Sequence, residues 1–336
     1  MSVHRTDVNC KNTISKEWPK ASFISSQLIL FQSRKKWGII YALATVVGLF
    51  CVLNVSLVHM ALETENVVAI ASKTIPLPVA SFLIIIGMYV LNDLMDADLD
   101  RLNEKKRPIP IGQVSKTQAW IFIILTNGIG LSMVLLTFNT DSIIIALVIA
   151  LIGLMYSIPK LALKDRFVIK TLSIAIAMIL CTMLGSTVNN WNTNYVSDDN
   201  NHFDRLSISI YAASMLGTMI FVTSPLNDLG DVIGDKAAGR RTIPIVIGRE
   251  NTVKLSIFIA TSMSIVSWIV YVSSDIGIVI PISVSLVIGL TIANITKILK
   301  LLDDYKFARD FVKKRSMPLH IMLQLALIIG ALLFWI

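Results

Sequence analysis

A series of long apolar segments runs along almost the whole chain, and it limits the folds open to this sequence more than any other feature. Each segment is close to the roughly 17–25 residues that a helix needs to cross the hydrocarbon core of a bilayer. Because lipid offers no hydrogen-bond partners, spanning segments of this kind satisfy their backbone groups internally, as helices. The sequence therefore predicts an all-α polytopic membrane protein with nine transmembrane helices. The predicted spans are residues 37–59, 76–91, 119–138, 142–159, 171–188, 207–226, 253–272, 276–295 and 319–336.

The composition agrees with this class and excludes several others. Only 15% of the 336 residues are charged, against about a quarter in a soluble domain, and the mean hydropathy is +0.71. The three cysteines lie far apart and the four histidines are scattered. The sequence therefore indicates neither a zinc or iron–sulfur site nor a disulfide framework. It also contains no P-loop and no GxGxxG motif, which are the signatures of ATP and dinucleotide binding.

The basic residues are distributed unevenly between the two ends of the predicted helices. If the N-terminus is cytoplasmic, all of the 30 Lys and Arg residues except Lys73 and Arg205 fall in cytoplasmic segments. Because cytoplasmic loops of membrane proteins carry such an excess, we expect a cytoplasmic N-terminus and a C-terminus on the opposite side. The net charge of +8 then reflects topology and contact with anionic lipid. No basic soluble domain suggests a nucleic-acid partner.

The chain divides into a short polar tail and one large apolar region. Residues 1–33 are polar and then mixed, without the pattern of a cleavable signal peptide. Trp37 then opens the first apolar span. We expect residues 1–33 to form a cytoplasmic or interfacial tail and residues 34–336 to form the membrane domain.

Two carboxylate-rich motifs of identical spacing follow two of the predicted spans. Residues 92–100 and 227–235 both read Asn-Asp-Leu-x-Asp-x-x-x-Asp. On a helix, residues four apart lie along one face, and oxygen ligands in this number suit Mg²⁺. One such motif alone is also compatible with a solvated helix end, but two matching copies favour a cation site. The predicted metal ligands are Asn92, Asp96, Asp100, Asn227, Asp231 and Asp235.

Basic residues lie close to both motifs in the sequence. Carboxylates that hold a metal and are ringed by Lys and Arg are the expected binding site for a diphosphate, since basic side chains bind the oxygens that the metal leaves free. The alternative for each single residue is a lipid-facing role that only sets topology. The candidates for diphosphate binding from this pattern are Arg101, Arg107, Lys160, Lys164 and Arg240.

From Arg34 to its end, the chain resembles the UbiA-type intramembrane prenyltransferases. Residues 92–100 with Arg107-Pro108 and Gly112 are similar to the family pattern NDxxDxxxD…RPxxxG. The second motif is similar to DxxDxxxG/D…TxP, with Thr242-Ile243-Pro244 as its last part. The segment from Tyr156 to Lys160 is similar to the family element YSxPP, although Lys160 replaces the second proline.

The resemblance implies a helical bundle around a central cavity, with both motifs facing each other across its cytoplasmic mouth. It implies an enzyme that depends on Mg²⁺ and transfers a polyprenyl group from a prenyl diphosphate to a lipophilic acceptor in the bilayer. We expect catalytic roles for Asp93, Asp228 and Tyr156. Arg34 occupies the position where relatives place a basic residue near the substrate pocket, and we expect it to bind the diphosphate. Tyr89 and Tyr156 are candidates for stabilising a prenyl cation.

Three alternatives for the function remain open on the sequence. The acceptor is either an aromatic quinone precursor or an isoprenoid glycerol-phosphate lipid. A terpene cyclase of the same family would ionise a prenyl diphosphate without any acceptor. A membrane transporter also combines internal repeats with intramembrane charges, but here the carboxylates lie at helix ends and are flanked by basic residues.

Overall fold

The computed structural model describes residues 21–52, 67–102, 106–188, 199–274, 276–300 and 305–334. Within these residues the regular structure is entirely helical, and nine helices are long and apolar enough to cross a membrane. The predicted all-α fold with nine spans is thereby confirmed. The long helices are α1 (Phe23–Val52), α4 (Pro76–Met95), α6 (Lys116–Leu135), α7 (Thr140–Ser157), α8 (Ile169–Ser186), α9 (Asp199–Asp228), α12 (Arg249–Ser273), α13 (Val279–Leu299) and α14 (Tyr305–Phe334).

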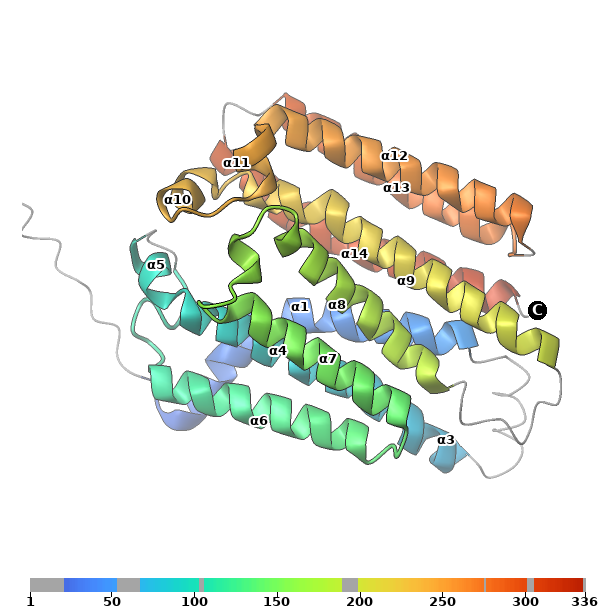
Figure 1. Ribbon diagram of the computed structural model, residues 1–336, viewed down its shortest axis with the longest axis horizontal. Helices are drawn as coiled ribbons and strands as arrows, with labels where there is room; N and C mark the ends of the chain where they lie inside the picture. The colour runs from blue at the N-terminus through green and yellow to red at the C-terminus, as the bar shows by residue number, and fades with distance from the viewer. Residues whose placement is uncertain are drawn as a thin grey trace, which may run out of the picture.

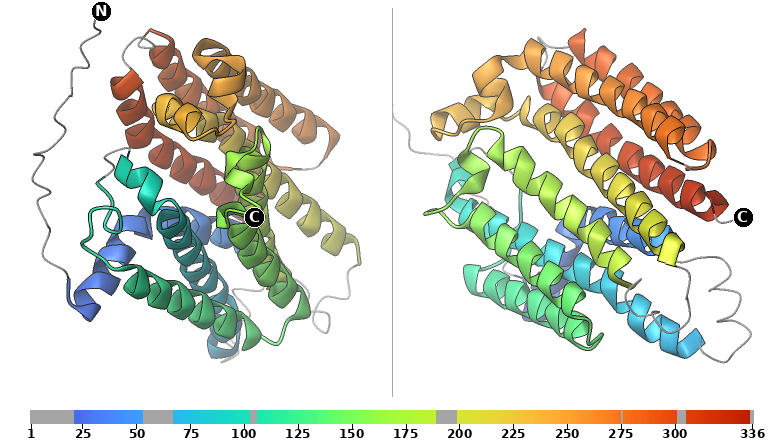
Figure 2. Two further views of the ribbon diagram at one scale, coloured as in Figure 1. Left: turned by 60° about the vertical axis from the view of Figure 1, so that its left-hand side comes forward. Right: turned by 45° about the vertical axis from the view of Figure 1, so that its right-hand side comes forward.

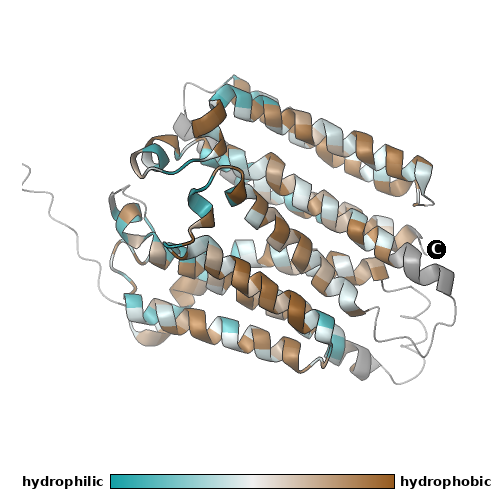
Figure 3. Cartoon of the chain, in the orientation of Figure 1, coloured by the Kyte–Doolittle hydropathy of each residue, from teal (hydrophilic) through white to brown (hydrophobic). Residues whose placement is uncertain are grey.

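Five short helical segments connect the long helices. They are α3 (Val67–Thr74), α5 (Ala97–Leu102), the 3₁₀ turn η1 (Leu163–Asp165), α10 (Val232–Ala237) and α11 (Ile243–Ile247). The long helices run roughly alongside one another, and α5, α10 and α11 gather at one end of the bundle (Figures 1 and 2). Hydrophilic residues are concentrated at this same end, around α5 and α10 (Figure 3). Both carboxylate motifs therefore lie at one end of the molecule.

The first helix begins earlier than the apolar pattern indicates. α1 starts at Phe23, because no proline or glycine interrupts the chain between that residue and Trp37. Leu30 is buried against residues of α4 and α6. The helix is thus continuous through residue 34, and the division between tail and membrane domain at this residue stays a prediction.

Helices α1 and α8 lie at the centre of the bundle. α1 contacts α4, α8, α9 and α14, and α8 contacts α7 and α9. The crossing of α1 and α8 is very close: a Cβ atom on Gly48 would lie 1.8 Å from the carbonyl oxygen of Thr182, and one on Gly185 would lie 1.9 Å from that of Thr45. Small residues of this kind let membrane helices approach backbone to backbone.

Substituting Gly185 by alanine is expected to lower the free energy of unfolding by about 1–3 kcal/mol, the usual cost of overpacking. The added methyl group meets backbone atoms, which cannot rotate away. The matched control is Gly289→Ala in α13, where a Cβ atom meets no heavy atom within 4 Å. Thermal unfolding in detergent checks this prediction, and equal stability of the two variants would contradict it.

Candidate active site

The first motif lies across the junction between two helices. Asn92 and Asp93 lie in the last turn of α4, Asp96 follows the helix, and Asp100 lies in α5. Backbone hydrogen bonds from the Asp96 amide to the Asn92 carbonyl (3.0 Å) and from the Asp100 amide to the Asp96 carbonyl (2.7 Å) keep the turn helical across the junction. The motif is therefore presented on an ordered backbone.

The second motif has the same arrangement at the end of α9. Asn227 and Asp228 end this helix after Pro225, and Asp231 immediately precedes α10, which carries Asp235. The Asp235 amide donates to the Asp231 carbonyl at 2.8 Å, which matches the bond between Asp100 and Asp96. The repeat seen in the sequence is thus a repeat of local structure.

A cavity of ≈ 480 Å³ lies between the two motifs. Carboxylates and amides from both motifs line it together with basic residues from α1, from the segments after α5, α7 and α10, and from the first turn of α8. Its polar lining includes Asn92, Asp96, Asn227, Asp228, Asp231, Asp235, Arg34, Arg107, Lys164, Lys170 and Arg240. The structure thereby brings together most of the metal-ligating and diphosphate-binding residues that the sequence predicts.

Arg240 connects the two motifs. It follows α10 in the chain, yet its guanidinium donates to Asp96 at 2.6 Å and lies 3.5 Å from Asp235 and 2.8 Å from Asp165. The ammonium group of Lys164 donates to the same Asp96 oxygen at 2.8 Å and to Asn92 at 3.2 Å. Burial raises the pKa of Asp96, but the two cations outweigh burial and hold its pKa below the ordinary value. Asp96 is therefore ionised at neutral pH.

Lys164 reaches the cavity because of a local turn. It lies in η1, which follows Ala162, a residue in the left-handed region with φ 35°. The Arg241 amide donates to the Asp165 carbonyl at 2.9 Å, so η1 is held against the segment that carries Arg240. Lys164 is 6% exposed, and its charge is directed inward.

Asp93 forms ion pairs with two arginine residues and does not line the cavity. Arg34 binds both of its carboxylate oxygens, and Arg107 donates to Asp93 at 2.8 Å and to Asp100 at 2.5 Å. Neither Asp93 nor Asp100 belongs to the cavity lining. In this arrangement the two carboxylates position Arg34 and Arg107, which do line the cavity. The catalytic role of Asp93 and the metal-ligand role of Asp100 stay predictions.

Lys170 is a site residue that the site prediction from sequence did not include. Its ammonium group donates to Asp228 at 2.6 Å, which corresponds to the pairing of Arg34 with Asp93. The separation is 58 residues in this pair and 59 in the pair of Arg34 and Asp93. The nearly equal offset from the two motifs is a sequence signal that could have identified Lys170.

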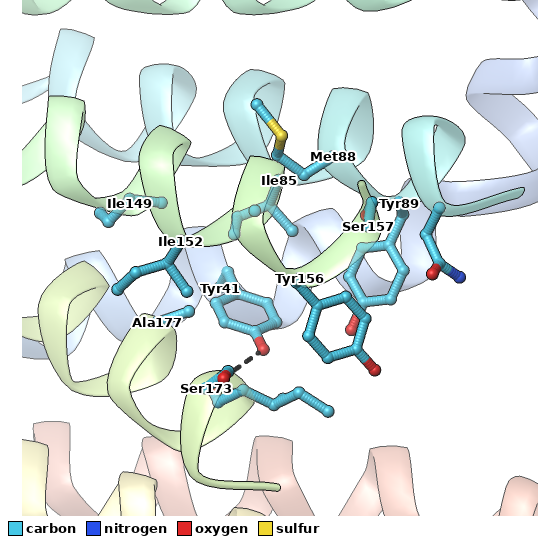
Figure 4. Close-up of a pocket in the computed structure, with 13 residues that line it drawn as sticks. Tyr41, Ile85, Met88, Tyr89, Ile149, Ile152, Tyr156, Ser157, Ser173 and Ala177 are labelled. Carbon is cyan, nitrogen blue, oxygen red and sulfur yellow. Dashed lines mark hydrogen bonds between the residues drawn. The ribbon is translucent and has the colours of Figure 1, made fainter. Parts of the chain in front are cut away.

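An aromatic surface lies beside the charged groups. Trp37 stacks on Tyr89 with ring centroids 5.8 Å apart, and the Arg34 guanidinium lies 5.7 Å from the Tyr89 centroid. Tyr41, Tyr89 and Tyr156 also border a second, mainly apolar pocket between α4, α7 and α8 (Figure 4). Ile149, Ile152 and Met88 line its walls. A charged cavity and an apolar pocket are therefore adjacent.

Two predicted residues lie away from the cavity. Lys160 is exposed, and the Arg101 side chain is 62% exposed and donates to the Pro110 carbonyl at 3.1 Å. Their diphosphate contacts stay predictions.

We expect Lys164→Ala to reduce turnover far more than Lys160→Ala, by roughly 10²-fold, since only Lys164 directs its charge into the cavity. Initial rates of both variants at saturating substrate check this expectation, and equal losses would contradict it.

The donor set of the cavity suits a hard cation in its chemistry. It consists of carboxylate and amide oxygens, which are the ligands that Mg²⁺ prefers. Among the described residues, no group of three Asp, Glu, His or Cys side chains is placed to hold a metal ion. Lys164 and Arg240 form ion pairs with Asp96, and Lys170 forms one with Asp228. The oxygen donors therefore fit Mg²⁺. A bound diphosphate would compete with the carboxylates for the side chains of Lys164, Lys170 and Arg240.

The sequence model of the UbiA prenyltransferase family matches residues 49–317. The chain belongs to this family. This assignment confirms the resemblance and the enzyme class, a prenyltransferase, and it identifies an integral multi-pass membrane protein.

Several members of the family are similar to the chain at low sequence identity. The digeranylgeranylglyceryl phosphate synthase of Methanopyrus kandleri is 24% identical over 200 residues, which are 60% of this chain and 67% of the relative. The chloroplastic chlorophyll synthase of Oryza sativa is 29% identical over 167 residues, which are 48% of this chain and 41% of the relative. The matched segments thus cover 67% and 41% of the lengths of these two relatives.

Solved structures of the family share the fold. A structure described as a digeranylgeranylglyceryl phosphate synthase in membranes matches 92% of this chain and 99% of its own, with a TM-score of 0.62 and 22% identity. A UbiA homologue from Archaeoglobus fulgidus bound to GPP and Mg²⁺ matches 92% of this chain and 99% of its own, with a TM-score of 0.59 and 17% identity. These likenesses show that the helical arrangement is that of the family.

Proposed function

We propose that this protein transfers a polyprenyl group from a prenyl diphosphate to a lipophilic acceptor in a reaction that depends on Mg²⁺. The observation that carries the proposal is the cavity in which both carboxylate motifs meet buried cations, directly beside an apolar pocket. The family homologue from Archaeoglobus fulgidus with bound GPP and Mg²⁺ supports the same combination of ligands.

Asn92, Asp96, Asn227, Asp231 and Asp235 are the residues that would hold the metal, since they line the cavity with oxygen donors. Bound Mg²⁺ would neutralise charge that develops on the diphosphate oxygens as the prenyl group leaves. Asp228 lies in the same cavity but is paired with Lys170, so its proposed role is to position that cation.

The basic residues bind the remaining diphosphate charge. Arg34, Arg107, Lys164, Lys170 and Arg240 line the cavity from different segments of the chain. Preorganised cations in a partly dry site stabilise the negative charge of the leaving group more strongly than they would in water. Their present carboxylate partners hold them in place before the substrate binds.

In this proposal the apolar pocket, ≈ 80 Å³ in volume, receives the part of the hydrocarbon chain nearest to the diphosphate. Its aliphatic walls exclude water, which would otherwise capture a prenyl cation. The faces of Tyr89 and Tyr156 border both the pocket and the cavity. Aromatic faces attract cations through the ring quadrupole, so these two residues lie where positive charge would develop.

We place the active site on the cytoplasmic side of the membrane. The basic residues that follow the motifs belong to the side that carries nearly all Lys and Arg of the chain, as cytoplasmic loops do. As the acceptor we propose an isoprenoid glycerol-phosphate lipid, because relatives from several archaea are digeranylgeranylglyceryl phosphate synthases.

The test uses purified protein with geranylgeranyl diphosphate and Mg²⁺, with and without geranylgeranylglyceryl phosphate. We expect release of diphosphate that depends on the acceptor and on Mg²⁺, together with a doubly prenylated lipid in the organic extract. An aromatic acid as the better acceptor would replace the proposed lipid. A cyclic hydrocarbon or alcohol formed without acceptor would overturn transfer and identify a terpene cyclase.

A further inference from the structure

Helix α14 carries three buried polar side chains on successive turns. Ser316, His320 and Gln324 are 5%, 1% and 0% exposed, and their spacing of four residues puts them on one face of the helix. The segment from Lys314 to Leu333 is a candidate membrane span. Polar and ionisable groups inside such spans are unfavourable and usually serve a function.

These side chains connect to the wall of the main cavity through α9 and α1. The His320 Nε2 atom lies 2.9 Å from the Thr223 hydroxyl on α9, and the Gln324 amide donates to the Ile40 carbonyl on α1 at 2.8 Å. Thr223, Ile40 and Ser316 all line the cavity. We name Thr223, Ser316, His320 and Gln324 the polar seam.

The polar seam retains unused hydrogen-bonding capacity. Among the described residues, the Nδ1 atom of His320 and the Oε1 atom of Gln324 are buried without a partner. Thr223 lies 3.0 Å from the Met219 carbonyl, to which its hydroxyl donates. With His320 donating to it, the Thr223 oxygen still has a free lone pair. The side chains of the seam include no Asp, Glu, Lys or Arg, so the seam suits a neutral hydroxyl donor better than a carboxylate.

We propose that Thr223 accepts a hydrogen bond from the hydroxyl group of an alcohol acceptor, and that His320 is a positioning residue that holds Thr223 in place. This inference rests on the proposed function. In the reaction, the acceptor oxygen forms a bond to the allylic carbon, and the bond from that carbon to the diphosphate breaks. The electron pair leaves with the diphosphate. The proton of the acceptor hydroxyl, directed at Thr223 during the attack, passes to the diphosphate once the new carbon–oxygen bond has formed. Thr223 orients the attacking oxygen and exchanges no proton.

The first experiment compares Thr223→Val with Thr223→Ser. We expect Thr223→Val to raise the KM for geranylgeranylglyceryl phosphate roughly tenfold, the upper range for loss of one hydrogen bond. Its KM for geranylgeranyl diphosphate should stay unchanged. Thr223→Ser keeps the hydroxyl and should stay close to wild type. The control Thr218→Val removes a hydroxyl of the same helix that bonds the Ser214 carbonyl at 2.7 Å and does not line the cavity.

The second experiment addresses His320. His320→Leu should raise the acceptor KM as Thr223→Val does, and the double variant should be no worse than either single one. His320→Gln, which offers an N–H donor to Thr223, should restore most of the affinity. The positioning role would be overturned if the increases in acceptor KM of Thr223→Val and His320→Leu were fully additive in the double variant. It would also be overturned if His320→Gln raised the acceptor KM as much as His320→Leu.

Direct binding of labelled geranylgeranylglyceryl phosphate to detergent-solubilised protein separates this inference from the proposed function, because it needs no turnover. Wild-type binding that Thr223→Val does not weaken would overturn the inference. A Thr223→Val variant with a changed KM for the prenyl diphosphate and an unchanged KM for the acceptor would also overturn the inference. Absence of product despite acceptor binding that depends on Thr223 would overturn the transferase function alone. If Thr223→Val does not fold, Thr223→Ala and the His320 variants decide the question.

Discussion

Replacing Asp96 by alanine is expected to reduce prenyl transfer by roughly 10²–10³-fold, the range for loss of one preorganised electrostatic contact in an active site. Asp96 bonds both Lys164 and Arg240 and is a proposed metal ligand. Its loss leaves two cations without their partner and removes the link between the two motifs. Initial rates with geranylgeranyl diphosphate and acceptor measure the effect.

Asp98 supplies the matched control for this variant. It lies two residues further along, its side chain is 78% exposed, and it reaches Arg101 and Lys116 only at 3.9 and 3.8 Å. Asp98→Ala should therefore keep the wild-type rate. Comparable losses in Asp96→Ala and Asp98→Ala would show that general surface charge, rather than the geometry of the cavity, controls the reaction. Unchanged elution in size-exclusion chromatography establishes that both variants are folded.

Replacing Lys170 by methionine is expected to have the largest effect on stability, about 3–5 kcal/mol, because breaking a buried ion pair leaves the other charge uncompensated. The side chains of Lys170 and Asp228 are 17% and 12% exposed and lie 2.6 Å apart. Asp228 would remain at the end of a membrane helix without the cation that it is hydrogen-bonded to. Thermal unfolding in detergent, at constant pH and detergent concentration, measures the loss.

The double variant Lys170→Met with Asp228→Asn tests the cause. Once the carboxylate is neutralised, no uncompensated charge remains, and most of the stability should return. Lys254→Ala removes an exposed cation paired with Glu250 and should leave the unfolding temperature unchanged. A double variant as unstable as Lys170→Met would indicate that the lysine stabilises the protein by packing rather than by its charge.

Much of the site follows from the sequence because its signals are local. Hydropathy over about 20 residues locates a membrane span, and a repeat of identical spacing locates both carboxylate motifs. Of the six predicted metal ligands, Asp100 alone falls outside the cavity lining. Asp100 is instead paired at 2.5 Å with Arg107, seven residues further along, which lines the cavity.

Residues that look equivalent in sequence were separated only by the folded chain. Lys160 and Lys164 both follow the fourth span, but the left-handed residue Ala162 and the turn η1 direct only Lys164 to Asp96. Spacing from the motifs offers no such distinction, because side-chain direction after a helix depends on individual backbone angles.

The sequence by itself determined the helical membrane class, the number of spans, the two motifs and the family, since all of these rest on composition and short-range spacing. The tertiary structure determined which polar and charged side chains contact each other. Arg240 contacts Asp96 across 144 residues, and His320 contacts Thr223 across 97. Such contacts depend on how whole helices pack, and close approach at Gly48 and Gly185 sets that packing for α1 and α8. Pairings of this range carry no periodic signal along the chain, so only the folded bundle reveals them.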